Sequence, residues 1–202
     1  MGEPAALRLG AVVLAGGRSR RMGEPKALAD RGGVPLAAFV AGVVAAVCDP
    51  VVICHAAGQR LPDLPAGVEP VADSVPDRGP LQAIADGIRA VGERADAVFV
   101  AATDLPLLTS ATVASLAELL RAGDRAVVPL RAGRTQPLAA VYRVSMLVEC
   151  EQLLAAGDLR ATALAATAGV RLVDAAALPN PRALTNVNTP AALRAALGGP
   201  RT

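Results

Sequence analysis

The sequence predicts an α/β fold, with helices on both faces of a mostly parallel, mixed sheet. Two observations support this class. Short β-branched runs alternate along the chain with alanine- and leucine-rich helical patterns, and most of these runs are apolar throughout, as expected when both faces of a sheet are covered. Alternation of this kind predicts β-α-β units with right-handed crossovers. With 202 residues, of which 53% are hydrophobic, the chain (1–202) is expected to form a single domain with a sizeable core.

The first half of the chain contains predicted strands at residues 10–15, 51–54, 68–72 and 97–102, and predicted helices at 35–47, 81–91 and 109–121. Pro35 suits the first turn of its helix, because the N–H that proline lacks has no intrahelical partner there. The third helix has Thr109 or Ser110 as its N-cap and Gly123 as the residue that ends it.

The second half begins with two predicted strands, 126–129 and 138–143, which flank R-A-G-R at 131–134. A glycine at this place predicts a hairpin connection. Further elements are predicted as helices at 145–156 and 160–168 and a short strand at 170–173. The last helix begins with Thr189 as N-cap and Pro190 at the first helical position.

Composition argues against several classes of partner. The net charge of +2 is too small for a general nucleic-acid binder, and aromatic side chains, at 1%, are too few for bases to stack on. Cys48, Cys54 and Cys150 form no C-x-x-C pair and, with the single His55, no familiar zinc spacing. No apolar leader opens the chain, and the longest apolar stretch, residues 34–48, is short for a membrane span. We therefore expect a cytoplasmic protein that binds neither nucleic acid nor membrane.

A glycine- and arginine-rich segment follows the first predicted strand. It reads G-G-R-S-R-R-M-G-E-P-K over residues 16–26 and places four cations and one acid within residues 18–26. Glycines let a backbone approach an anion and cations neutralise it, so the segment is typical of a polyphosphate site. It matches neither G-x-G-x-x-G nor G-x-x-x-x-G-K-[ST], which argues against a dinucleotide site or an ATPase P-loop. The alternative is a solvated basic loop at a strand end.

Polar residues also follow two later strands, and in a doubly wound sheet such segments converge on one edge, where ligands bind. Asp104, in T-D-L-P, is the best candidate for a metal ligand, because Mg²⁺ takes one or two carboxylates plus substrate phosphates. Alternatively, Asp104 only caps the turn that follows it. Asp73 is a candidate metal ligand for the same reason, and the alternative is that it only forms an Asx-type turn with Ser74.

Lys26 and an asparagine pair complete the candidate residues. Lys26 ends the basic segment, where its ammonium can reach a phosphate as a mobile point charge. Asn186 and Asn188 precede the last helix, and both side chains face the same way if the segment is extended. Taken alone, the two asparagines are equally consistent with a plain loop.

Five segments in this order resemble the molybdenum cofactor guanylyltransferase family of the nucleotidyltransferases, also called molybdopterin-guanine dinucleotide biosynthesis protein A. They are L-A-G-G-R-S-R-R-M-G-E-P-K-A-L, A-D-S-V-P-D-R-G-P-L, A-T-D-L-P-L-L, Q-P-L-A-A-V-Y and N-V-N-T-P. The resemblance covers residues 9–197. L-A-G-G followed by R-R-M-G, together with N-V-N-T-P, favours the guanylyl branch over the cytidylyl branch. The resemblance implies a Rossmann-like fold of the nucleotide-diphospho-sugar transferase type.

The resemblance implies Mg²⁺-dependent transfer of GMP from GTP to molybdenum-molybdopterin, with release of pyrophosphate. It assigns the N-terminal part of the chain to the nucleotide and the C-terminal part to the acceptor. It implies catalytic roles for Lys26, Arg21 and Asp104, the last as metal ligand. The residues implied in nucleotide binding are Leu14, Ala15, Gly16, Gly17, Arg18, Arg20, Lys26, Asp73, Gly79, Pro80, Leu81 and Asp104. The residues implied on the molybdopterin side are Arg160, Asn186 and Asn188.

The implied reaction agrees with the residue types present. A phosphate nucleophile is already an anion and needs no general base, so the absence of a catalytic histidine or Ser–His pair is expected. Two positions depart from the family pattern: Pro25 replaces an acid that often precedes the lysine, and Cys54 stands where many members have asparagine. Alternatives are a CTP-dependent or other phosphate nucleotidyltransferase of the same fold, or a non-catalytic binding module. Transient contact with a protein that delivers or receives the cofactor is also open.

Overall fold

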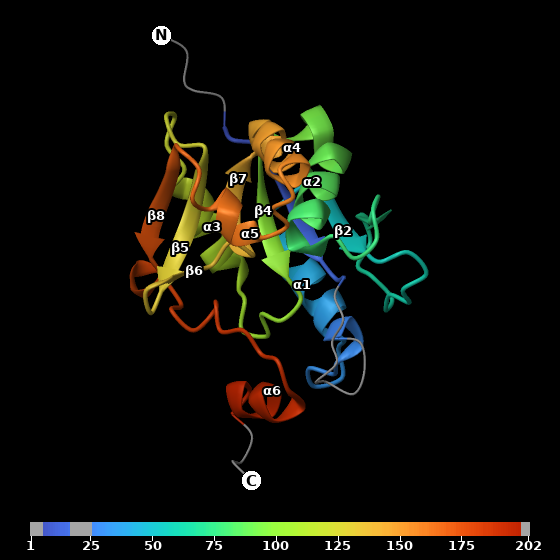
Figure 1. The fold of residues 1–202 in the computed structure, drawn as a ribbon. Helices are drawn as coiled ribbons and strands as arrows, with labels where there is room; N and C mark the ends of the chain where they lie inside the picture. The colour runs from blue at the N-terminus through green and yellow to red at the C-terminus, as the bar shows by residue number, and fades with distance from the viewer. Residues whose placement is uncertain (1–5, 17–25, 199–202) are drawn as a thin grey trace.

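The computed structural model describes residues 6–16 and 26–198, with Lys26 described by its backbone alone. Within these residues the core is an eight-stranded sheet in the order β3-β2-β1-β4-β7-β5-β6 (Figure 1). Strands β6 and β7 both pair with one edge of β5, and the eighth strand, β8, pairs with its other edge. The strands are β1 (Leu9–Leu14), β2 (Val51–His55), β3 (Val68–Ala72), β4 (Ala97–Ala102), β5 (Ala126–Arg131), β6 (Arg134–Thr135), β7 (Ala139–Arg143) and β8 (Val170–Asp174).

The sheet is mostly parallel, as predicted. Strands β3, β2, β1 and β4 are parallel neighbours, whereas β7 runs antiparallel between β4 and β5. In the centre, Val13 of β1 lies opposite Ile53 on one side and Ala101 on the other. The carboxyl ends of β1 to β4 therefore meet at one edge of the sheet, which is the edge where ligands bind in such folds.

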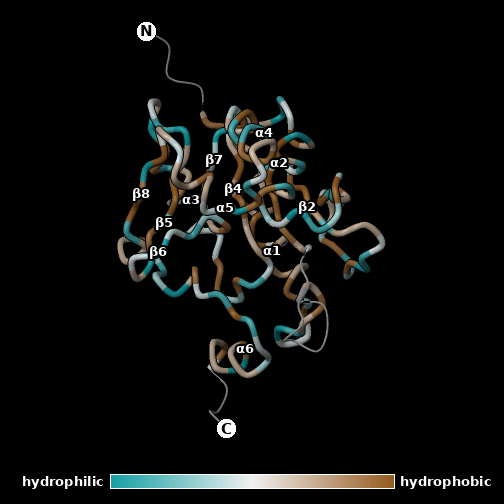
Figure 2. The backbone as a smooth tube through the Cα atoms, in the orientation of Figure 1, coloured by the Kyte–Doolittle hydropathy of each residue, from teal (hydrophilic) through white to brown (hydrophobic). Residues whose placement is uncertain are grey.

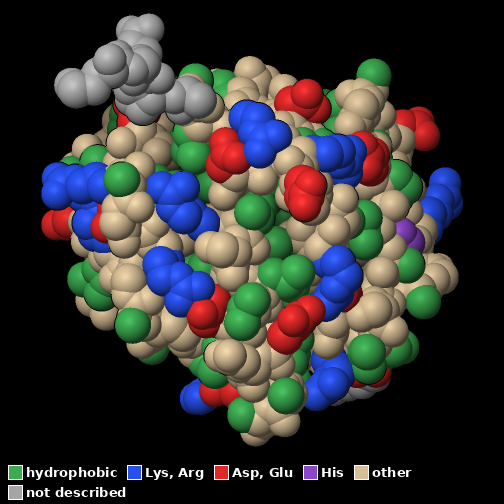
Figure 3. Space-filling model, turned by 90° about the horizontal axis from the view of Figure 1, so that it is seen from above, with side chains coloured by type: hydrophobic (Ala, Val, Ile, Leu, Met, Phe, Trp, Pro, Cys, Tyr) green, Lys and Arg blue, Asp and Glu red, His purple; other side chains and the backbone are tan. Residues whose placement is uncertain are grey.

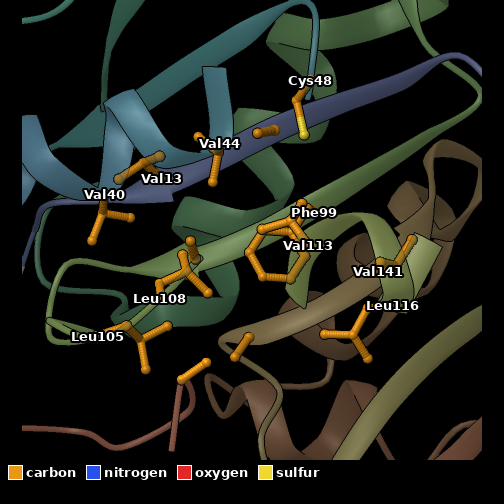
Figure 4. Close-up of a cluster of buried hydrophobic side chains, with 14 of the residues drawn as sticks. Val13, Val40, Val44, Cys48, Phe99, Leu105, Leu108, Val113, Leu116 and Val141 are labelled. Atoms are coloured by element: carbon orange, nitrogen blue, oxygen red, sulfur yellow. The ribbon is translucent and has the colours of Figure 1, made fainter. Parts of the chain in front are cut away.

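Helices cover both faces of the sheet, and each face has its own apolar core. Helices α1 (Leu36–Ala45) and α3 (Ser110–Glu118) pack on one face, around Val13 and Phe99 (Figure 4). Helices α2 (Gly79–Val91), α4 (Leu147–Ala155) and α5 (Ala161–Leu164) pack on the other, around Val12 and Val100. Successive strand residues point to opposite faces, so covering both faces requires the unbroken apolar runs visible in the central strands of Figure 2.

Local end signals predicted several features correctly. The Thr109 side chain accepts a hydrogen bond from the Thr112 N–H at the start of α3. The Thr189 side chain does the same at the start of α6 (Pro190–Ala196), where Pro190 holds the first position. The predicted hairpin joins β5 to β6 through two residues with positive φ, Ala132 at 49° and Gly133 at 73°. Two positive φ values in succession are typical of the type I′ turn, which matches the twist of paired strands.

Two helices end three or more residues earlier than predicted. Helix α3 ends at Glu118 rather than near residue 121, because the Asp124 carboxylate accepts from the Arg121 N–H and closes a turn there. Gly123 is therefore not the residue that ends the helix. Helix α5 ends at Leu164 rather than 168, because the Thr167 hydroxyl donates to the Leu164 carbonyl. Both differences arise from short polar side chains that compete for backbone groups.

The end of the molecule opposite the carboxyl edge carries paired charges. Arg8 binds Asp96 at 2.6 Å beside the starts of β1 and β4, and Arg94 binds Glu69 at 2.6 Å. In Figure 3, which views this end, basic and acidic side chains are interspersed. Exposed pairs of this kind contribute little to stability, because water and salt screen them. No helix in the described ranges is long and apolar enough to cross a membrane.

Candidate active site

The end of β1 lies beside the carboxylate of Asp73, which follows β3. The Ala15 N–H donates to the Cys54 carbonyl at 2.8 Å, which ties the end of β1 to β2. A Cβ placed on Gly16 would lie 3.4 Å from Asp73 Oδ2 and 3.8 Å from the Ala56 nitrogen. Glycine therefore leaves the start of the basic segment open toward Asp73. The predicted convergence of these two segments on one edge is confirmed.

Gln59 supports this junction and was not found from the sequence. Its side-chain N–H donates to the Ala15 carbonyl at 2.8 Å, and its carbonyl oxygen accepts from the Ala56 N–H at 3.1 Å. The amide thus bridges the ends of β1 and β2, directly before the basic segment begins. An isolated glutamine in a loop gives no sequence signal for such a role.

Asp73 has an oxygen without a partner. Its Oδ1 is buried and accepts no hydrogen bond from any described residue, while its N–H donates to the His55 carbonyl. Burial, followed by the nearby charge of Asp86, raises the pKa of the Asp73 carboxyl, and the charge of His55 opposes this. An unsatisfied buried acceptor beside an open edge is a place for a ligand that donates a hydrogen bond.

Asp86 holds the segment that carries Asp73. Asp86 lies on α2, is 5% exposed, and accepts from both the N–H and the hydroxyl of Ser74. Gln82 and Arg89 donate to the same carboxylate, at 3.1 and 2.9 Å. Because Ser74 is fixed in this way, the neighbouring Asp73 is held toward Gly16. Asp86 was not identified from the sequence, although an acid on the buried side of an apolar helix is an available signal.

Replacing Asp73 with asparagine tests the cost of its charge. The raised pKa means that ionising Asp73 disfavours the folded state as the pH rises through that pKa, with the full cost above it. We expect Asp73→Asn to raise the free energy of unfolding at neutral pH by about 0.5–1 kcal/mol, a gain that disappears in acid. Nucleotide affinity should fall by about tenfold, since a charged acceptor is lost. Denaturant unfolding at several pH values and nucleotide titration measure both; unchanged affinity would argue against a ligand at Asp73.

Asp104 and the asparagine segment are in direct contact, as neither motif alone could show. The Asn186 side-chain N–H donates to Asp104 Oδ1 at 2.9 Å, and the Val187 N–H donates to the Asp104 carbonyl at 3.0 Å. Val187 is 1% exposed and packs with Leu36 of α1 and Leu193 of α6. Asn186 and Asn188 are both exposed on either side of it, as predicted for an extended segment.

The carboxylates of this edge suit a divalent metal that is held largely by its substrate. Among the described residues, no group of three or more His, Cys, Asp or Glu side chains could enclose an ion. Asp73 and Asp104 follow β3 and β4, which are separated by β2 and β1, so about 14 Å of sheet edge lies between them. A single carboxylate at Asp104 fits Mg²⁺, which keeps its other positions for phosphates and water.

The start of α2 lies against the segment that contains Arg160. Gly79 has a φ of +72°, and a Cβ there would lie 3.1 Å from the Leu159 carbonyl. The Leu81 side chain is buried in the core, whereas Gly79 and Pro80 are exposed. Arg160 is exposed and pairs with Asp158 at 2.7 Å, which lowers the pKa of Asp158 to about 2. Arg160 therefore lies beside α2, whereas Asn186 lies at Asp104.

Cys54 does not face this edge. Its thiol is buried, donates to the Ala83 carbonyl of α2 at 3.3 Å, and has a pKa raised by burial. The residues that do follow β2 at the edge are Ala56 and Gln59. The departure from the family pattern at Cys54 thus replaces a polar residue with part of the core beneath α2.

Part of the predicted site lies outside the described residues. Gly17, Arg18, Arg20 and Arg21 belong to this part, as does the side chain of Lys26, and their roles remain predictions. The backbone of Lys26 begins a short 3₁₀ turn, η1 (Lys26–Leu28).

Arg31, which was not identified from the sequence, follows this turn. It donates from Nε to the Pro106 carbonyl at 2.6 Å and stacks 3.8 Å above the Phe39 ring. It thereby joins the chain that follows Lys26 to the loop that follows Asp104.

The mixed sheet, with carboxylates at its carboxyl edge and a glycine-opened first loop, defines a nucleotidyltransferase domain. Residues 11–171 match the MobA-like NTP transferase domain, and the chain belongs to this family. It is 39% identical over 196 residues to a probable molybdenum cofactor guanylyltransferase of Mycobacterium tuberculosis, covering 95% of this chain and 94% of that one.

Solved structures show the same fold. Molybdopterin-guanine dinucleotide biosynthesis protein A from Archaeoglobus fulgidus superposes with a TM-score of 0.75 at 22% identity, covering 93% of this chain and 96% of that one. Rv0371c of M. tuberculosis, in a complex with manganese, superposes with a TM-score of 0.61 at 20% identity, covering 83% and 88%. Together they confirm the nucleotide-diphospho-sugar transferase type of fold.

Proposed function

We propose that this protein transfers GMP from GTP to molybdenum-molybdopterin, giving molybdopterin guanine dinucleotide and pyrophosphate. The observation that carries the proposal is the pairing of Asp104 with Asn186, which brings the carboxylate beyond β4 and the N-V-N segment into one site. The name of the M. tuberculosis relative, which matches nearly the whole chain, supports the choice of substrates.

In the proposed reaction a phosphate oxygen of the acceptor attacks the α-phosphorus of GTP. A new P–O bond forms there, the bond from the α-phosphorus to the oxygen bridging to the β-phosphate breaks, and pyrophosphate leaves with that electron pair. Both reactants are anions, so the enzyme must neutralise charge and align them rather than remove a proton. Nucleotidyl transfer of this kind uses a divalent metal ion, which we propose to be Mg²⁺.

Different residues along the carboxyl edge of the sheet would bind the metal ion, the triphosphate and the acceptor. Asp104 would hold the metal ion, whose charge would offset that of the phosphates when it is bound, and Asn186 orients the carboxylate. Lys26, Arg18, Arg20 and Arg21 would bind the triphosphate, together with backbone N–H groups at Gly16 and Gly17. Asn188 would contact the acceptor beside Asp104, and Arg160 would contact it from the segment that lies against the start of α2.

The nucleoside would lie toward β3. The unpartnered Oδ1 of Asp73 offers an acceptor to a nucleoside hydroxyl or amino group, next to Leu14, Ala15 and Gly16. Gly79 and Pro80 would border the base with their backbone, and the side chain of Leu81 supports them from the core. We place the reaction in the cytoplasm, where the three free cysteines of the chain would stay reduced.

The direct test is incubation with Mg²⁺, GTP and molybdenum-loaded molybdopterin. We expect molybdopterin guanine dinucleotide and pyrophosphate in equal amounts, detected by chromatography and a coupled phosphate assay. Pyrophosphate without dinucleotide would mean hydrolysis rather than transfer and would contradict the proposal. A non-catalytic binding module would release no pyrophosphate.

The choice of base is tested separately by thermal unfolding with each nucleoside triphosphate and Mg²⁺. A ligand present at 100 times its Kd stabilises the folded protein by about 2.7 kcal/mol. We expect this stabilisation with GTP and not with ATP, CTP or UTP at the same concentration. Stabilisation by CTP but not GTP would replace the guanylyl proposal with the cytidylyl alternative and leave the reaction class intact.

A further inference from the structure

The β5–β6 hairpin places two arginines side by side. Arg131 and Arg134 are cross-strand partners next to the Ala132–Gly133 turn, and both are exposed. Side chains of cross-strand partners lie on the same face of the sheet, and like charges in this position are destabilising. An anion bound between the two guanidinium groups would remove this repulsion.

Neither arginine is neutralised by an acid among the described residues. The Nη2 of Arg131 donates to the Thr185 hydroxyl at 3.2 Å rather than to a carboxylate. The nearest acid by register is Asp174, opposite Leu130, and its carboxylate accepts from the Ala176 N–H. This differs from the opposite end of the molecule, where the arginines bind acids and the charges are interspersed (Figure 3).

The arginine pair adjoins the proposed acceptor site. Consecutive residues connect the two: Thr185 accepts from Arg131, and Asn186 donates to Asp104. The chain between β8 and α6 that carries both residues runs beneath the carboxyl ends of the strands (Figure 1).

The order of the strands gives the distance between Arg131 and Asp104. Arg131 ends β5 and Asp104 follows β4, with only β7 between the two strands, so two strand spacings, about 10 Å, separate them. A fused-ring compound with one charged group at Asp104 can therefore extend a second charged group to the hairpin.

We infer that Arg131 and Arg134 bind the anionic metal–dithiolene group of the acceptor. This inference rests on the proposed function, whose acceptor carries its reacting phosphate and an anionic metal–dithiolene group on the same fused ring system. With the phosphate near Asp104, the metal–dithiolene group would extend toward the hairpin. Guanidinium groups suit it, because their planar arrangement of donors binds oxyanions and other diffuse anions through paired hydrogen bonds.

The test compares Arg131→Gln/Arg134→Gln with the wild-type enzyme. We expect the KM for molybdenum-molybdopterin to rise about 10- to 100-fold, from the loss of two charge-assisted hydrogen bonds, while the KM for GTP and kcat stay within about twofold. Arg121→Gln is the matched control, because Arg121 is also exposed but precedes β5 at the opposite end of the sheet. Binding of the acceptor without GTP, followed by its fluorescence, should weaken by the same factor.

Several outcomes would overturn the inference. An unchanged acceptor KM in the charge-reversed Arg131→Glu/Arg134→Glu enzyme would do so while leaving the proposed function standing. Equal losses toward GTP and acceptor would indicate a general structural effect instead. A loss seen only when a carrier protein supplies the acceptor would make the hairpin a protein-docking site. Absence of dinucleotide from the wild-type enzyme would overturn the proposed function and, with it, this acceptor.

Discussion

Asp104→Ala is expected to lower turnover by about 100-fold or more, because the metal ion loses its protein carboxylate and the phosphates lose a clamp. Asn186→Ala should have a smaller effect, about tenfold, since it removes only the hydrogen bond that orients this carboxylate. Pyrophosphate release at several Mg²⁺ concentrations measures both, and the apparent metal affinity should fall in the same order.

Asp63→Ala is the control for this pair, because Asp63 is an exposed carboxylate in the connection between β2 and β3. It should leave turnover and metal dependence unchanged. Thermal unfolding of each variant shows whether it is folded. Wild-type turnover in a folded Asp104→Ala protein would exclude Asp104 as the metal ligand.

Gly87→Ala is expected to destabilise the protein by about 3 kcal/mol or more. Gly87 lies inside α2, on the side of the helix that packs against β1 and β2. A Cβ there would lie 2.2 Å from Val12 Cγ1 and 3.1 Å from Cys54 Sγ, so the helix must shift or the strand must move. Val12 belongs to the central strand and is fully buried, which leaves no room for relaxation.

Gly42→Ala provides a matched control within another helix. A Cβ on Gly42 of α1 would meet only Pro65 Cγ, at 3.7 Å, which is ordinary contact. Alanine should therefore stabilise α1 by about 0.5–1 kcal/mol through its higher helix propensity. Urea unfolding compares the two variants, and Val12→Ala in the Gly87→Ala background should recover part of the loss. Similar small effects from both glycines would contradict the close packing of α2.

Local patterns in the sequence were sufficient for most of the architecture. The apolar run at β4 identifies a strand buried on both faces, and Thr189-Pro190 identifies the start of α6, because caps and strand runs depend on neighbouring residues alone. The position of Asp104 also followed from the sequence, since a residue directly after a buried parallel strand must lie at the carboxyl edge. The family resemblance added the substrates and was confirmed at the level of the family.

Only the tertiary structure decided how these segments meet. Gln59 joins the ends of β1 and β2, Asp86 holds the loop of Asp73, and Asn186 binds Asp104 across 82 positions of sequence. Cys54 stands where many family members have asparagine, and the register of β2 turns its thiol into the core under α2. Such pairings depend on sheet order and register, and strands far apart along the chain set both through burial of their shared faces. The sequence by itself determined which residues reach the carboxyl edge, and the tertiary structure decided which partners hold them there.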